Sequence, residues 1–295
     1  QVFIGLENIN PDNLKHARKG QNKITEYRQM LQAWRKVGVF TYCGYILGFP
    51  DDTPQSIERD IEIIKRELPV DILEFFILTP LPGSQDHQRL HNQGVWMDPD
   101  MNKYDLEHVT TAHQRMSTQE LESIYRRAWD LYYTREHIET LVKRAIACGM
   151  QSSKLTWLLL AFPGSVWFDK VHPLQSGFFR RKVRTQRRSD MPLENRLLFY
   201  PRRAIEIVRT MARYYRYLQW LRRLNKRLVA DPATSDYTDI AIRPVEQADV
   251  ESLDMFQATR GADLAVAKAR RMANILDEAG AGKKQNARAP SRAVS

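Results

Sequence analysis

The first eighty residues alternate between short apolar runs and segments with helical spacing. The apolar runs cover 2–6, 39–47 and 71–78, and each has the length of a buried strand. Between them, 23–37 and 53–68 carry apolar residues three or four positions apart, which predicts amphipathic helices. Apolar strands that alternate with helices are typical of a parallel sheet covered by helices. The pattern therefore predicts a piece of a doubly wound sheet or of a β/α barrel.

Capping residues mark where several helices begin. Thr53-Pro54 combines a capping hydroxyl with a proline suited to the first turn, and the Ser-Thr-Gln-Glu sequence of 117–120 is a capping box. One helix is expected from this box onward, and another over about 136–147. Further on, 203–228 has apolar residues at steps of three and four. This spacing predicts one long amphipathic helix with an arginine-rich outer face, ended by Asp231-Pro232.

Cysteine use and hydropathy limit the class of protein. The chain has two cysteines, Cys43 and Cys148, which is too few for a secreted disulfide framework and favours a reducing cytoplasm. We expect both thiols to be small buried residues. The longest apolar stretch, 155–168, is interrupted by Pro163-Gly164 and is too short to cross a membrane.

The net charge of +10 is concentrated in one segment. Residues 178–227 hold 16 Lys and Arg against three acidic residues. Arginines interleaved with Tyr and Trp, as in 213–223, suit an anionic membrane surface, with the apolar 157–168 beside it. They also suit nucleic acid, which we favour less. The plain alternative, a solvated helix face whose Arg stems cover apolar surface, stays open.

Three strand ends carry motifs that point to a known family. They read Ile4-Gly-Leu-Glu-Asn-Ile-Asn10, Gly44-Tyr-Ile-Leu-Gly-Phe-Pro50 followed by Asp-Asp-Thr, and Phe76-Ile-Leu-Thr-Pro-Leu-Pro-Gly83. In this order and spacing they resemble the fourth, fifth and sixth strands of the radical S-adenosylmethionine barrel. The resemblance is to the branch whose members often carry an N-terminal cobalamin-binding domain. The segments 172–182 and 199–201 are similar to the C-terminal extension of that branch.

The resemblance implies that the chain is divided into four parts. Residues 1–115 would form the C-terminal half of the barrel, and 116–150 a helical segment packed on it. A basic, mostly helical extension would follow over 151–278, with a last short helix over 264–276. The tail, 279–295, is rich in Ala, Gly, Lys and Arg and is predicted to be disordered. The expected fold class is thus α/β, a partial barrel of parallel strands followed by a mostly α-helical extension.

Ligands of parallel barrels bind at the carboxyl ends of the strands. The resemblance assigns Glu7 and Asn8 to the ribose and amino-acid end of S-adenosylmethionine, the strand from Gly44 to Gly48 to the adenosyl group, and 78–80 to the adenine. Independently, a carboxylate can accept from ribose hydroxyls, and glycine lets a backbone approach a ligand closely. The plain alternatives are a solvated acid, glycines needed for sheet curvature, and ordinary turn prolines. The candidate residues are Gly5, Glu7, Asn8, Gly44, Ile46, Gly48, Leu78, Thr79 and Pro80.

The resemblance also implies cofactors that this sequence does not hold by itself. Members of the family bind a 4Fe–4S cluster through a Cys-x-x-x-Cys-x-x-Cys loop, and some use cobalamin. This chain has no such loop. Because Gln1 is followed at once by an apolar run, we expect the cluster-binding part upstream and the chain alone to be inactive. We do not expect a metal site from the irregularly spaced His87, His91, His108 and His113, although one of them facing a substrate stays open.

The implied function is that of an enzyme fragment. The complete protein would use S-adenosylmethionine and a reductant protein to functionalise a C–H bond, with cobalamin-dependent methyl transfer to a small or lipid-like substrate as one outcome. The alternative is a non-catalytic basic module that binds anionic membranes or RNA. A cytoplasmic protein is expected, with peripheral contact of 178–228 at the inner membrane surface.

Overall fold

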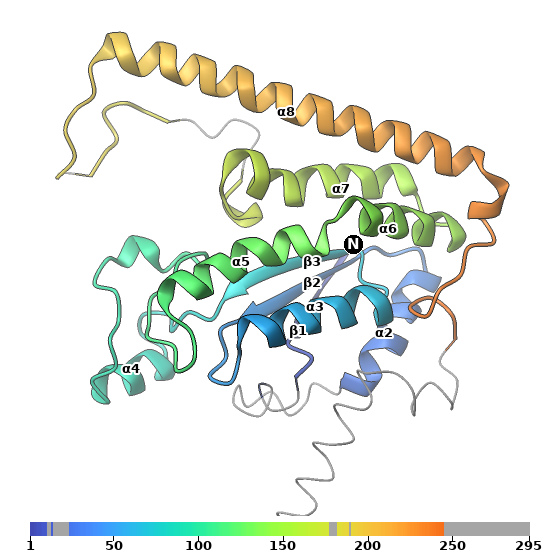
Figure 1. Cartoon of the computed structure of the whole chain (residues 1–295), viewed down its shortest axis with the longest axis horizontal. Helices are drawn as coiled ribbons and strands as arrows, with labels where there is room; N and C mark the ends of the chain where they lie inside the picture. The colour runs from blue at the N-terminus through green and yellow to red at the C-terminus, as the bar shows by residue number, and fades with distance from the viewer. Residues whose placement is uncertain (11–12, 14–23, 177–181, 189, 245–295) are drawn as a thin grey trace, which may run out of the picture.

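The computed structural model is an α/β structure with a three-stranded parallel sheet and a mostly helical remainder (Figure 1). It describes residues 1–10, 13, 24–176, 182–188 and 190–244. The strands are β1 (Val2–Glu7), β2 (Thr41–Leu47) and β3 (Ile72–Ile77), hydrogen-bonded in the order β1-β2-β3. The three predicted strands are confirmed. The predictions of a last helix over 264–276 and of a disordered tail lie outside the described residues.

The crossover helices form where the sequence predicts them. Helix α2 (Ile24–Lys36) leads from β1 to β2, and α3 (Pro54–Glu67) leads from β2 to β3. The Thr53 hydroxyl accepts from the Ser56 N–H, and the Ser56 side chain accepts from the Thr53 N–H, so α3 begins with a complete capping box. The apolar side chains at steps of three and four along α3 are buried, and they are Ile57, Ile61, Ile64 and Leu68.

Helices follow the sheet in the rest of the described chain. The chain after Gly83 forms α4, and the predicted long helix begins earlier than residue 203. It does so because Asn195 caps the Leu197 N–H, and Pro201 is accommodated within the helix. The helices are α4 (Gln85–Asn92), α5 (Thr118–Tyr132), α6 (Arg135–Ala147), α7 (Ser152–Gly164) and α8 (Arg196–Ala230), with 3-10 turns η1 (Met101–Lys103), η3 (Pro173–Gln175) and η4 (Pro232–Thr234) and a π-helical turn η2 (Ser165–Asp169).

The long helix α8 lies along α7 on the outside of the molecule (Figure 1). Its second half packs through Leu221, Leu224 and Leu228, which are buried, whereas apolar side chains of its first half are exposed. Helix α7 contributes Leu155 and Leu159 to the core. In the described part of the chain, no helix combines the length and the hydropathy needed to cross a membrane.

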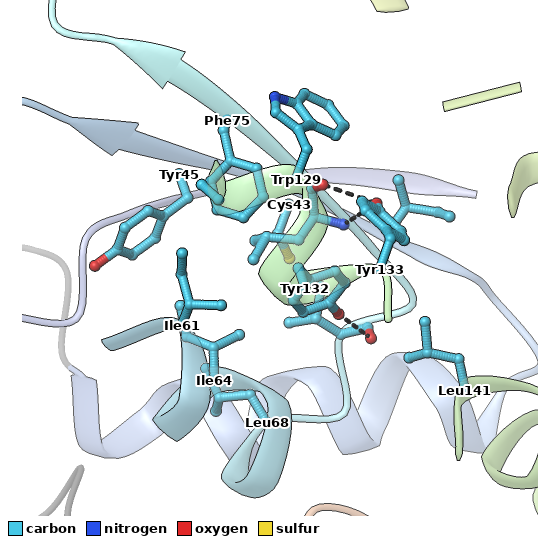
Figure 2. Packing of buried hydrophobic residues seen from close by; sticks show 14 of the residues in the cluster. Cys43, Tyr45, Ile61, Ile64, Leu68, Phe75, Trp129, Tyr132, Tyr133 and Leu141 are labelled. Atoms are coloured by element: carbon cyan, nitrogen blue, oxygen red, sulfur yellow. Dashed lines mark hydrogen bonds between the residues drawn. The ribbon is translucent and has the colours of Figure 1, made fainter. Parts of the chain in front are cut away.

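The two faces of the sheet are covered differently. On the closed face, Cys43, Tyr45 and Phe75 are buried against α3 and α5, and the Phe75 ring lies 5.4 Å from the Trp129 ring (Figure 2). The other face, called the open face here, carries the row Gly5–Gly44–Glu74. It is exposed at its β1 side, where Phe3 is 57% exposed. One face of the sheet is therefore closed by α3 and α5. The other is covered by α7 and the segment around His172 at β2 and β3, and is exposed at β1.

The outer edge of β3 is covered by groups from later in the chain. The Tyr133 hydroxyl donates to the Leu73 carbonyl at 2.8 Å and accepts from the Leu73 N–H at 3.0 Å (Figure 2). The His172 Nε2 lies 3.1 Å from the Phe75 carbonyl oxygen, and the Ile77 N–H donates to the Leu106 carbonyl at 2.8 Å. These bonds satisfy backbone groups that would otherwise offer an edge for pairing with another strand.

A buried carboxylate fixes where β3 starts. Asp71 accepts from the Thr41 N–H at 2.8 Å and from the Thr41 hydroxyl at 3.0 Å, and it pairs with the guanidinium of Arg35 at the end of α2. All three side chains are buried. Asp71 thereby joins the starts of β2 and β3 to α2, and sets the register of the two strands.

We predict that Asp71→Ala lowers the free energy of unfolding by about 3–5 kcal/mol, because it leaves a buried guanidinium without its carboxylate. Urea unfolding followed by circular dichroism measures this. The matched control is Asp86→Ala on α4, whose exposed pair with Arg89 should contribute less than about 0.5 kcal/mol. Equal unfolding midpoints for the two variants would contradict the assigned role of Asp71.

Candidate functional site

Glu7 lies at the carboxyl end of β1 in a conformation unusual for its residue type. Its φ is +61°, in the left-handed region, and the pairing with β2 shifts by one residue between Gly5 and Glu7. Its carboxylate folds back over Gly5, where a Cβ on that glycine would lie 2.8 Å from Oε1. A larger residue at position 5 would displace this carboxylate. Strain of this kind at a strand end is found at binding sites, where surrounding structure holds it.

The neighbouring Asn8 is buried and engaged in the loop that follows β1. Its side-chain oxygen accepts from the Asn10 N–H at 2.7 Å, and its Nδ2 donates to the Ile46 carbonyl on β2 at 3.4 Å. Asn8 therefore ties the end of β1 to that of β2 and fixes the position of Glu7 beside it. The contacts observed for Asn8 are structural ones, and a contact with a ligand stays a prediction.

The turn after β2 is organised by Asp52. This buried carboxylate accepts from the N–H groups of Gly48 at 2.9 Å and Phe49 at 3.0 Å, and from Asn13 at 2.7 Å. Burial raises its pKa, and these hydrogen bonds oppose that shift. The Gly-Phe-Pro-Asp-Asp-Thr motif thus has a structural reason, because its second aspartate, Asp52, closes the loop at the carboxyl end of β2.

Gly44 in β2 and Gly48 directly after it meet different surroundings. Gly48 has φ +94°, which favours glycine, and a Cβ there would lie 3.1 Å from Leu121 of α5. Gly44 lies on the open face, where a Cβ would lie 3.1 Å from each of the rings of Phe3 and Phe76. Both positions need glycine for conformation or packing. The assignment of these glycines and of Ile46 to an adenosyl group stays a prediction.

The end of β3 completes the edge at which the candidate residues gather. The Leu78 N–H donates to the Leu47 carbonyl at 2.8 Å, and the Thr79 hydroxyl donates to the Ile77 carbonyl at 3.0 Å. Leu78 is exposed and Pro80 is buried. Since the strands are parallel, the structure brings Glu7, Asn8 and 78–80 to the same edge of the sheet.

A buried glutamate on the open face was not singled out in the sequence. Glu74 lies in the middle of β3, fully buried, and burial raises its pKa to about 8. Neither of its two carboxylate oxygens has a hydrogen-bond partner among the residues that the structure describes. An acid inside the apolar run of 71–78 is the signal that could have identified it.

His172 is the polar neighbour of Glu74 in the described structure. Its Nδ1 accepts from the Leu174 N–H at 3.3 Å and lies 3.5 Å from Glu74 Oε1, while Nε2 faces the Phe75 carbonyl. Burial lowers the pKa of His172 to about 4, so the ring is neutral near pH 7. These partners place the proton on Nε2 and leave Nδ1, which lies near Glu74, as an acceptor. A protonated Glu74 suits this arrangement, so the pair is a neutral acid beside a neutral base.

Other polar candidates have structural partners. His113 Nε2 lies 2.7 Å from the Phe49 carbonyl oxygen, and its Nδ1 accepts from the N–H groups of Arg115 and Met116. His108 pairs with Asp105. The structure brings His113 to the loop that Asp52 organises, and it shows no His87–His91–His108–His113 cluster among the described residues.

The two cysteines differ from one another. Cys43 is buried on the closed face as expected, and burial raises the pKa of its thiol. The expectation that Cys148 is buried is wrong, because it follows the last turn of α6 on the surface. Two separated thiols, one of them protonated in the core, do not fit the ligand set of a 4Fe–4S cluster. No group of three metal-ligating side chains occurs among the described residues.

Comparisons with known proteins point to methyltransferases. No family model matches the chain. Over 184 residues it is 28% identical to a bacteriochlorophyllide d C-12(1)-methyltransferase of Chlorobaculum tepidum, covering 61% of the chain and 35% of that protein. It is 26% identical over 156 residues to an uncharacterized methyltransferase of Pyrococcus horikoshii, covering 49% of the chain and 33% of the relative. A bacteriochlorophyllide d C-8(2)-methyltransferase of C. tepidum is 26% identical over 118 residues, covering 39% of the chain and 25% of the relative.

The similar proteins are thus methyltransferases, and the chain spans about a third of the length of the first two. The matches agree with the sequence resemblance at the level of methyl transfer.

We predict that Glu74→Gln removes a pH-dependent loss of stability. The pKa of Glu74 is raised from 4.5 to about 8 in the folded protein, so the folded state holds a proton that the unfolded state releases above pH 4.5. The wild type should therefore lose about 2–4 kcal/mol relative to the Gln variant as the pH rises from 5 to 8. Urea unfolding across this range measures the difference.

The control for this prediction is Glu62→Gln on α3, which removes an exposed glutamate paired with Lys65. The difference in the free energy of unfolding between this variant and the wild type should stay nearly constant with pH. If the free energy of unfolding of the Glu74→Gln variant changes with pH in parallel to that of the wild type, Glu74 is ionised in the folded protein.

Proposed function

We propose that this chain is part of a radical S-adenosylmethionine enzyme that transfers a methyl group, and that the carboxyl ends of β1, β2 and β3 hold the adenosyl part of S-adenosylmethionine. The observation that carries the proposal is Glu7, a carboxylate in a strained left-handed conformation at the end of a parallel strand. It folds over Gly5 on the one sheet face that the crossover helices leave open. Parallel α/β sheets bind their ligands at this end.

The residues at this edge have distinct tasks in the proposal. Glu7 accepts from the ribose hydroxyls, and Asn8 and Asp52 position the loops on either side of it. Leu78 supplies exposed apolar surface beside the backbone of Thr79 for the adenine. When bound, S-adenosylmethionine supplies the methyl group or the adenosyl radical. The chain's own residues bind and orient the nucleoside.

The comparisons support methyl transfer as the reaction class. Two of the similar proteins are named for methylation of a bacteriochlorophyllide. We extend this to a small or lipid-like organic substrate for the present protein. Its chamber would form between the open face and a further part of the barrel, and a reductant protein in the cytoplasm would supply electrons.

We propose the 4Fe–4S cluster and cobalamin only for a longer protein of which this chain is a part. The two thiols of this chain do not fit a cluster, so no catalytic step is assigned to its residues beyond nucleoside binding. The partial barrel itself is part of the proposal, in which 1–115 provides the last three strands.

We predict that the chain binds S-adenosylmethionine and that Glu7→Gln weakens this binding by about tenfold, the effect of losing charge-assisted hydrogen bonds to the ribose. Isothermal titration calorimetry at constant salt measures it. The control is Glu62→Gln. Glu62 lies on α3, which covers the closed face of the sheet, so this variant should bind S-adenosylmethionine as the wild type does. Equal affinity of the Glu7 variant and wild type would remove Glu7 from the site.

We also predict that the 295-residue chain forms no 4Fe–4S cluster when reconstituted with iron and sulfide under argon. Absorption spectroscopy tests for the cluster, and chromatography for 5′-deoxyadenosine after addition of a reductant. A cluster band together with adenosyl cleavage would contradict the view that this chain holds only the nucleoside part of the site.

A further inference from the structure

A second concave surface lies in the helical part of the molecule. A groove of about 340 Å³ is bounded by the start of α6, the turn η2 and the middle of α8. We call it the aromatic groove, after the rings of Trp167, Tyr217 and Trp220 that line it together with arginines. None of the residues that line it lies at the carboxyl ends of the strands, so the groove is separate from the proposed adenosyl site.

The rings of the groove form a preassembled apolar wall. Tyr217 and Trp220 are stacked, with centroids 5.7 Å apart and planes 13° from parallel, and Trp167 meets Tyr217 edge-on at 5.5 Å. The Tyr217 hydroxyl donates to the Leu159 carbonyl of α7 at 3.2 Å, which anchors the wall to the core. All three residues are half-buried and line the groove, so part of each side chain stays accessible to a ligand.

Three arginines surround this wall. The Arg135 guanidinium lies over the Trp220 ring, 5.6 Å from its centroid, and Arg213 and Arg216 extend from successive turns of α8. All three side chains are exposed. Within the part of the chain that the structure describes, none of them forms an ion pair with an acid.

Two aspartates beside the groove each accept a hydrogen bond from a neighbouring ring, which leaves their negative charge in place. Asp130 accepts from the Trp167 ring N–H at 2.9 Å, and Asp169 accepts from the Tyr214 hydroxyl at 2.7 Å. Neither aspartate lines the groove. The groove therefore combines an apolar floor with an excess of positive charge, and a cationic ligand would be repelled by it.

We infer that the aromatic groove binds an amphiphilic organic anion, with its apolar body on the rings and its carboxylate or phosphate on Arg213 and Arg216. Guanidinium groups hold such anions through paired, charge-assisted hydrogen bonds, and Arg135 is oriented by its stacking on Trp220. A free amphiphile and the headgroup of an anionic lipid share this chemistry. Both would place the same anion on the same arginines.

The test uses the full chain and dodecyl phosphate below its micelle concentration, with tryptophan fluorescence as the signal. Dodecyl maltoside and dodecyltrimethylammonium have the same apolar chain with a neutral or a cationic head. We expect dodecyl phosphate to bind and the Arg213→Gln, Arg216→Gln double variant to bind it about tenfold more weakly or worse. The matched control is Arg209→Gln, Arg223→Gln, which removes two exposed arginines of α8 outside the groove.

The two double variants and the three amphiphiles distinguish binding in the groove from general attraction of anions to a basic surface. Equal weakening in the two double variants, or equal binding of all three amphiphiles, would overturn the inference. Circular dichroism confirms that both variants keep their helix content. Cosedimentation with phosphatidylglycerol vesicles that is lost only in the groove variant would identify a lipid headgroup as the ligand. Binding of dodecyl phosphate without cosedimentation would identify a free anion.

Discussion

The hydroxyl of Tyr133 donates to one backbone group of Leu73 and accepts from the other, and in this way it occupies the outer edge of β3. A parallel sheet of three strands has few contacts of its own and is exposed to pairing with other strands at its edges. Tyr133 comes directly after α5, and the segment after α7 adds His172. The helical part of the chain is therefore required for the sheet to exist in this form.

The consequence of this covering is an asymmetric sheet. The closed face and the β3 edge are buried under helices, whereas the β1 side of the open face is exposed at Phe3. Glu7 and Gly5 lie on that exposed side, and Glu74 lies in the same face but under the segment that carries His172. The geometry directs any ligand toward the ends of the strands on the β1 side, which agrees with the proposed nucleoside site.

The strand and helix pattern could be predicted from the sequence because local signals and tertiary packing agree there. Thr53 and Ser117 cap their helices, and the apolar stripe of α3 is buried as its spacing indicates. The start of α8 was missed because a proline at 201 argues against a helix, and the capping role of Asn195 carries little signal. Cys148 was expected to be buried because thiols usually are, but its position after the last turn of α6 exposes it.

The candidate site was predictable only as a set of strand ends. Parallel strands bring their carboxyl ends together whatever the side chains are, so Glu7, Asn8 and 78–80 were expected at one edge. The left-handed backbone of Glu7 and its carboxylate over Gly5 depend on a bulge that the sequence does not announce. The Glu74–His172 contact joins residues far apart in the chain, and the arrangement of η2 and η3 that brings them together follows from packing.

Hydrogen–deuterium exchange of the chain with and without saturating S-adenosylmethionine tests whether the three strand ends hold the nucleoside. We expect slower exchange in the peptides that cover 5–8, 44–50 and 77–80, and no change in the peptide 213–220 of the aromatic groove. Unchanged exchange at the three strand ends, or protection confined to other parts of the molecule, would contradict this assignment.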